Sequence, residues 1–150
     1  MTPRVENPFR NPSRRPEWAQ LTRLAGDRAA ILFEQLRTAV GSIEGLVEEL
    51  HFAGPEVGWI PRYRLGETTL FAAHISPGLL EASIELDESV CEKLLASPKT
   101  GAEFKAAIRS AITEGGTATV YVSLPTFTAV RSFARETRTK GKLVAALRTK

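Results

Sequence analysis

Two turn signals inside residues 57–86, VGWIPRYRLGETTLFAAHISPGLLEASIEL, constrain the fold of this chain more than any other feature. Leu65-Gly66 and Pro77-Gly78 each lie between runs that alternate like β-strands, which predicts two short hairpins. The segment is therefore expected to form a three-strand antiparallel meander.

The turns also predict which residues share a face of the sheet, because antiparallel partners lie side by side. Two-residue turns place Ile60 opposite Phe71, and Phe71 opposite Ile84. One predicted face is apolar and suits a core: Ile60, Phe71, Ala73, Ile75, Leu80, Ala82, Ile84 and Leu86. The other face is amphipathic: Trp59, Tyr63, Leu70, Ala72, His74, Glu81, Ser83 and Glu85.

Length and composition indicate an ordinary globular domain. A chain of 150 residues with 43% hydrophobic residues can bury its own core without metals or disulfides. Its one cysteine, Cys91, excludes an internal disulfide and a multi-cysteine zinc site, and is most simply a small buried hydrophobe. Residues 1–18 hold no apolar run of the kind found in a secretory signal or membrane anchor, and we expect a cytoplasmic protein.

Before the meander, helical spacing begins at Pro16, is interrupted at Gly26 and continues to about Val40. The next segment, residues 43–52, fits either a half helix or an edge strand. After the meander, Asp87 suits the cap of a helix.

A second helix is expected after the capping box formed by Thr100 and Glu103, with its end at Gly115-Gly116. Residues 117–124 alternate like a strand.

A final helix, capped by Thr126 or Thr128, is expected to reach about Thr139, where Gly141 breaks it.

This order predicts an α+β fold of two layers. We expect a mostly antiparallel four-stranded sheet, made of the three-strand meander and the late strand, with helices packed on one face and the other face partly open. Residues 16–142 would form a single α+β domain between a flexible basic arm, 1–15, and a basic tail, 143–150.

Short motifs around the meander carry a family resemblance: Glu48-Glu49-Leu50-His51-Phe52, then Gly54, Gly58-Trp59, Arg62-Tyr63, Leu70 and Pro77-Gly78. Over roughly Arg14 to Lys142 the chain resembles an uncharacterised bacterial family, domain of unknown function 3788, although the basic residues usual after the lead-in glycine are missing. The resemblance implies the fold and the bacterial cytosol, and it supplies no activity or catalytic residue. A more distant likeness is to the double-wing DNA-binding domains of the MmcQ/YjbR type.

His74 is the titratable residue of most interest for a binding site. The predicted register places it opposite Glu81, a carboxylate that should favour the protonated imidazole. Trp59 and Tyr63 share this face, and Tyr121 joins them if the last predicted strand adds to the sheet. Such an aromatic floor with a His–Glu pair suits a small flat or cationic ligand, or acid–base chemistry. The plainer interpretation is a solvent-facing ion pair beside aromatic rings that the N-terminal helices bury.

Charge is distributed unevenly: residues 1–30, 31–104 and 105–150 carry +3, −7 and +7. Basic ends suggest non-specific contact with nucleic acid, although solvated helix faces explain them more simply. The residues that would then contact phosphates are Arg4, Arg10, Arg14, Arg15, Arg131, Arg135, Arg138, Lys140 and Lys142.

Taken together, these features favour an uncharacterised single-domain cytosolic protein that binds a small molecule on the open sheet face. A nucleic-acid-binding module is the alternative. An enzyme ranks third, because no nucleophile with a matched base is visible, and no catalytic residue, metal site, cofactor or membrane contact is expected.

Overall fold

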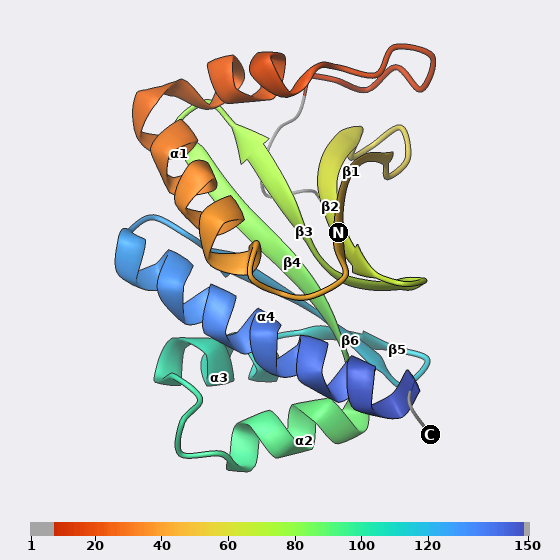
Figure 1. The fold of residues 1–150 in the computed structure, drawn as a ribbon, viewed down its shortest axis with the longest axis vertical. Coiled ribbons are helices and arrows are strands. Elements are labelled where there is room, and N and C mark those ends of the chain that lie inside the picture. The colour runs from red at the N-terminus through yellow and green to blue at the C-terminus, as the bar shows by residue number, and fades with distance from the viewer. Residues whose placement is uncertain (1–7, 149–150) are drawn as a thin grey trace.

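The computed structural model describes residues 8–148, with 143–148 as backbone alone. Its elements are α1 (Trp18–Val40), β1 (Leu46–Phe52), β2 (Trp59–Leu65), β3 (Thr68–Ser76), β4 (Leu79–Asp87), α2 (Glu88–Ala96), α3 (Ala102–Arg109), β5 (Ile112–Glu114), β6 (Thr117–Ser123) and α4 (Phe127–Arg148). The fold is α+β with an antiparallel sheet (Figure 1). The sheet has six strands rather than the predicted four.

The two additional strands come from segments whose local pattern was ambiguous or misleading. The strand order is β1-β2-β3-β4-β6-β5, so residues 43–52 contribute an edge strand, not a half helix. Gly115 and Gly116 have φ of 60° and 82° and form the turn of the β5–β6 hairpin. Two successive residues at positive φ suit a two-residue hairpin turn, so the predicted helix end at this pair is wrong.

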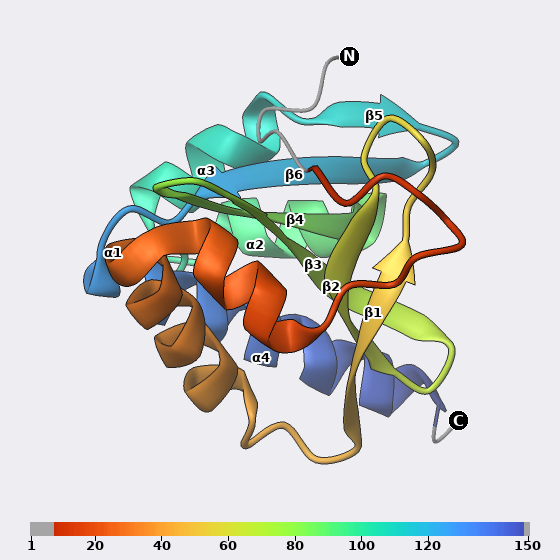
Figure 2. The ribbon, with the colours of Figure 1, turned by 90° about the horizontal axis from the view of Figure 1, so that it is seen from above.

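The helices pack against the sheet to form one hydrophobic core. Helices α1 and α4 lie side by side over β3 and β4, while α2 and α3 pack against β4 and β6 (Figures 1 and 2). The most deeply buried large side chains are Tyr63, Phe33, Phe71, Phe133, Leu21, Leu36, Leu70, Ile84, Leu86, Leu124, Val40 and Val120. This core positions the edge strand β1 beside α1.

Local signals at the helix starts were confirmed only in part. The Thr126 hydroxyl accepts a hydrogen bond from the Ala129 N–H at 3.1 Å, as expected for a cap. Asp87 occupies the cap position of α2 but makes no side-chain bond there. The capping box of Thr100 and Glu103 is wrong, because Gly101 is the cap residue of α3 and no side chain bonds the helix amides.

The β2–β3 hairpin contains a β-bulge that was not predicted from the sequence. The turn residues are Gly66 and Glu67, and beyond the turn the pairing skips one residue, so that Tyr63 lies opposite Phe71. Leu70 is the extra residue of β3. A turn displaced by one residue changes each cross-strand partner by two residues, so every side chain stays on its predicted face of the sheet. One extra residue in β3 has a different effect, because it changes the face on which the following residues of β3 lie relative to β2.

The predicted pairing of Ile60 with Phe71 is therefore wrong. Tyr63 takes that place, and Ile60, three residues away along β2, lies on the opposite side of the sheet from Phe71. The β3–β4 hairpin has the predicted register, with His74 opposite Glu81.

Lys140 of α4 binds this bulge. Its Nζ donates hydrogen bonds to the carbonyl oxygens of Thr69 at 2.8 Å and Leu70 at 3.0 Å, and to that of Glu85 in β4. Burial lowers the pKa of Lys140 to about 8, although the negative charges of Glu85 and Asp87 partly oppose this shift by raising it. The lysine thus satisfies carbonyl groups that the irregular pairing leaves available.

Helix α4 does not end near Thr139 but continues through Gly141 to Arg148. Gly141 is buried where the helix passes over the side chains of Ile43 and Leu70. Packing against these residues supports a helix that the local glycine signal alone would end.

Substitution of Gly141 by alanine is expected to raise the free energy of unfolding by about 0.5–1 kcal/mol. A Cβ at this position would lie 3.7 Å from both the Ile43 and the Leu70 side chain, which is an ordinary contact. Alanine also has less conformational freedom than glycine in the unfolded chain, so folding into the helix costs less entropy. Urea denaturation measures the change. Gly26→Ala is the matched control and should destabilise, because Gly26 interrupts α1 at a φ of 80°. A loss of stability in Gly141→Ala would contradict the packing described for α4.

Candidate functional site

The bulge separates the five residues predicted to bind a ligand. His74, Glu81 and Tyr121 remain together on the face of the sheet turned away from Phe71, since Ser83 is paired with Tyr121 and His74 with Glu81. Tyr63 lies on the other side, stacked on Phe71 with ring centroids 4.4 Å apart. The predicted group does not form one surface.

Within the part that stays together, His74 contacts Ser83 and Tyr121. His74 Nε2 lies 2.8 Å from Ser83 Oγ, and the His74 and Tyr121 ring centroids are 6.0 Å apart. Burial lowers the pKa of His74 to about 4. The expectation that Glu81 favours a protonated imidazole is therefore wrong, and His74 is neutral at pH 7.

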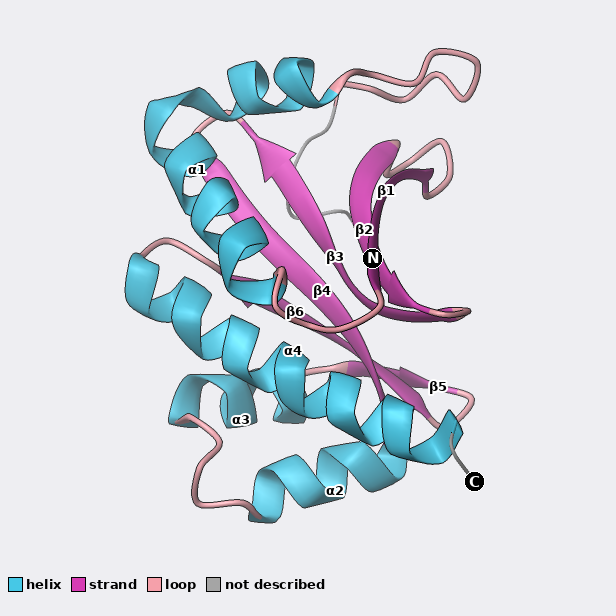
Figure 3. Ribbon diagram, in the orientation of Figure 1, coloured by secondary structure: helices cyan, strands magenta, loops and turns pink. Residues whose placement is uncertain are grey.

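Trp59 is bonded to the segment that precedes α1. Its backbone N–H donates to the Phe9 carbonyl and its indole Nε1 donates to the Asn11 carbonyl, both at 2.8 Å. The pairing of β2 with β3 ends at Arg62. The next residue, Pro61, has no N–H and so cannot donate a hydrogen bond to a neighbouring strand. Figure 3 shows β1 and β2 leaning away from β3 and β4 above this point. Trp59 thus attaches residues 9–11 to the separated end of β2.

Tyr63 belongs to a polar cluster between α1 and β1. The Tyr63 hydroxyl donates to Glu48 Oε2 at 2.8 Å, and Arg37 donates to both Glu48 oxygens through Nε and Nη2, each at 2.8 Å. Burial and the Glu48 charge raise the pKa of Tyr63. Burial alone would raise the pKa of Glu48, but its bonds to Arg37 and Tyr63 outweigh that effect and lower it. The Glu48 bond raises the pKa of Arg37. All three groups therefore hold one protonation state at neutral pH.

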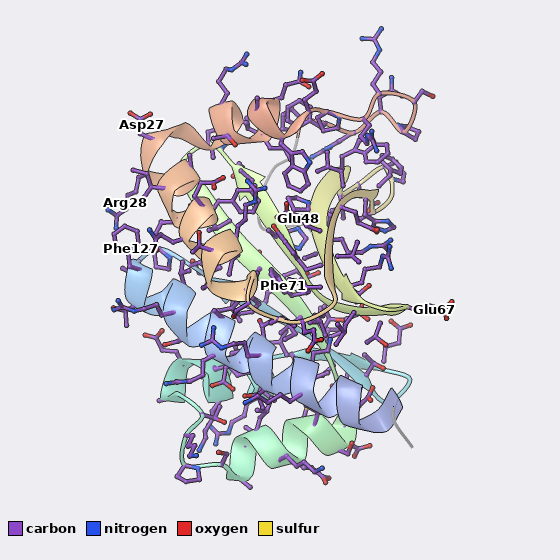
Figure 4. All side chains as sticks on the ribbon, viewed as in Figure 1. Asp27, Arg28, Glu48, Glu67, Phe71 and Phe127 are labelled. Carbon is purple, nitrogen blue, oxygen red and sulfur yellow. The ribbon has the colours of Figure 1, made fainter. Side chains whose placement is uncertain are left out.

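Aromatic rings extend this cluster along α1. The Arg37 guanidinium lies over the Trp18 ring, 5.1 Å from its centroid, and Trp18 stacks on Phe33 at 6.5 Å. Figure 4 shows Glu48 between the helix and the strands.

Two hollows meet at Glu48. One, of about 360 Å³, is lined by Glu34, Arg37, Thr38, Val40, Gly41, Leu46, Glu48 and Tyr63. The other, of about 660 Å³, is lined by Arg15, Pro16, Glu17, Trp18, Ala19, Glu48, Glu49 and Leu50. We call the two together the α1–β1 groove. Volumes of this size are typical of small-molecule sites.

Three carboxylates of the groove wall, Glu34, Glu48 and Glu49, are held by arginines. Glu48 binds Arg37, and Glu49 binds both Arg62 and Arg64 on the neighbouring strand. Arg15, by contrast, is exposed and forms no ion pair with any residue in the described range 8–148. Glu17, in the same wall, also forms no ion pair within this range, but it precedes α1, where the helix amides offset its negative charge. Arg15 therefore supplies the positive charge that remains for an incoming group.

Sequence reasoning missed Trp18, Arg37 and Glu48 as site residues. Glu48 and Tyr63 are cross-strand partners, but that relation exists only once residues 43–52 are a strand. The available signal was the spacing of Leu46, Glu48 and Leu50, which lie two residues apart and so share one face of a strand. The same segment also fitted a half helix, and the signal was therefore not decisive.

The basic residues proposed for nucleic acid contact are scattered. Lys140 is buried and its ammonium group is bonded to carbonyl oxygens, so it does not face solvent. Arg138 donates to the Ala39 carbonyl at 3.0 Å. The exposed members with described side chains are Arg10, Arg14, Arg15, Arg131, Arg135 and Lys142, and Arg4 lies outside the described residues. Nucleic-acid binding stays a prediction.

Comparisons with known proteins do not assign the chain to a family. No family model, no curated protein and no solved structure matches it. The resemblance to domain of unknown function 3788 therefore stays a prediction. Across residues 8–148 no helix has both the length and the apolar character needed to cross a membrane. In the same range, His, Cys, Asp and Glu side chains nowhere gather in threes as metal ligands would.

Proposed function

We propose that the protein binds a ligand in the α1–β1 groove, and that this ligand presents a flat ring and an anionic group. The observation that carries this proposal is the meeting of the two hollows at Glu48, with Trp18 and Arg15 in the wall. This proposal places the site in the groove and not on the open sheet face.

Each part of the groove suits binding. The Trp18 indole offers a ring for stacking and is held in place by Arg37 and Phe33. Arg15 offers the uncommitted positive charge. A cationic ligand is less favoured, because Glu48 and Glu49 are already neutralised by arginines, and the amides at the start of α1 offset the charge of Glu17.

The electrostatics favour binding over catalysis. Glu48 is held ionised and Tyr63 is held protonated, since the pKa of each is moved away from neutrality. Proton transfer works best with a group whose pKa lies near the working pH.

Two probes of opposite charge test this proposal: 2-naphthoate and 2-naphthylmethylammonium. Isothermal titration calorimetry is expected to show tighter binding of naphthoate, weakened about tenfold by Trp18→Ala, which removes the stacked ring. Arg15→Gln should reduce the preference for naphthoate, while Arg14→Gln, the neighbouring exposed arginine, should not. Binding of neither probe, or a preference for the ammonium, would contradict the proposal.

A further inference from the structure

The free edge of β1 runs along the α1–β1 groove. β1 is the outermost strand at its end of the sheet and pairs with β2 alone. The second hollow is lined by Glu48, Glu49 and Leu50 in succession, although neighbouring residues of a strand point to opposite faces. The hollow therefore encloses the edge of the strand rather than one of its faces.

The hydrogen-bond pattern shows which backbone groups face the groove. The Ala53 N–H donates to the Gly58 carbonyl, whereas the Trp59 N–H turns away from β1 to Phe9. Since hydrogen-bonded and non-hydrogen-bonded pairs alternate in an antiparallel ladder, Glu48 and Leu50 direct N–H and C=O away from β2. Within residues 8–148, no backbone group on the groove side of β1 is hydrogen-bonded to the backbone of Glu48 or Leu50.

We infer, resting on the function proposed above, that the natural ligand is an extended acidic peptide that adds a strand to β1. Its backbone pairs with Glu48 and Leu50, an aromatic side chain lies on Trp18, and a carboxylate binds Arg15. The outward backbone groups of Glu48 and Leu50 are two residues apart, about 7 Å, which is the repeat of an extended peptide. A single planar molecule does not match that repeat.

A second copy of the chain is a poorer occupant. Antiparallel pairing of two β1 edges about Glu49 would place the two Glu49 side chains opposite each other and bring Glu48 beside Leu50 of the other copy. Like charges directly opposite destabilise a sheet. A peptide with its own carboxylate near Arg15 matches the uncommitted charge instead.

The test uses acetyl-Val-Phe-Val-Glu-Val-amide and two N-methylated forms of it. One form is methylated at the first, third and fifth residues, the other at the second and fourth. Because alternate N–H groups of an added strand face β1, one form should bind at least about tenfold weaker than the parent and the other about as well. Amide hydrogen exchange on binding should slow at Glu48 and Leu50 and change little at Val47 and Glu49, which are already paired with β2.

Equal binding of the parent and both methylated peptides would overturn strand addition. If naphthoate binds the groove but the peptide does not, this inference fails and the proposed function stands; if neither binds, both fail. Arg15→Gln should weaken the peptide, and replacing its glutamate by glutamine should then cause no further loss. If the glutamine peptide lost as much affinity for the Arg15→Gln protein as it loses for the wild type, the peptide carboxylate would not bind Arg15.

Discussion

Replacement of Phe71 by alanine is expected to lower the free energy of unfolding by about 4 kcal/mol. Phe71 is 1% exposed, stacks on Tyr63 with centroids 4.4 Å apart, and meets the edge of Phe133 at 5.2 Å. It therefore joins β2, β3 and α4, and its removal leaves a cavity that three elements cannot all close. Urea denaturation followed by circular dichroism measures the loss.

Phe127→Ala is the matched control for this truncation. Phe127 begins α4 and is 50% exposed, and Figure 4 shows it at the outer end of the helix while Phe71 lies inside. Its replacement is expected to change stability by less than about 0.5 kcal/mol. A Phe71→Ala loss as small as that of the control would show that Phe71 does not occupy the core position described.

Lys140→Met is expected to lower the free energy of unfolding at pH 7 by about 2–3 kcal/mol. Methionine has nearly the same volume, so the change removes the donor while leaving the packing. The carbonyl oxygens of Thr69, Leu70 and Glu85 then lose the ammonium group that binds them. Lys142→Met, on an exposed residue of the same helix, should have little effect. An equal effect of the two substitutions would contradict the role assigned to Lys140.

The same lysine predicts a pH dependence of stability. Its pKa falls from 10.5 to about 8 on folding, so between these values the unfolded chain binds more protons than the folded one. Lys140 should therefore contribute a rise in stability with pH across this window of up to about 3 kcal/mol, and Lys140→Met should lack this contribution. Urea denaturation at pH 7.5 and pH 10 measures the difference between the two proteins. A difference that stays constant would show that Lys140 does not titrate in this window.

Much of the fold could be predicted because its signals are local. Pro77-Gly78 lies between two strands and sets the register of β3 and β4, with Gly78 at a φ of 73°. Gly26 interrupts α1 where the helical pattern pauses. Alternation marked β6 and placed Tyr121 on the same face as Ser83. Each of these features depends on neighbours within a few residues.

The candidate site could not be predicted in the same way, because it depends on contacts between distant segments. Residues 43–52 carry a weak pattern and become a strand because β2 is present to pair with them. Only then do Glu48 and Tyr63 become partners, with Arg37 of α1 completing the cluster. The α1–β1 groove is a property of this assembly.

The sequence by itself determined four strands, β2, β3, β4 and β6, the turn between β3 and β4, and the existence of the amphipathic helices, since turn geometry and side-chain periodicity are encoded locally. Only the tertiary structure decided which face of β2 meets the core. The extra residue Leu70 turns Tyr63 inward, and what supports this bulge is Lys140, about 70 residues further along the chain. Its partners are carbonyl oxygens, which every residue carries. No residue type in β3 therefore marks the position where the register changes.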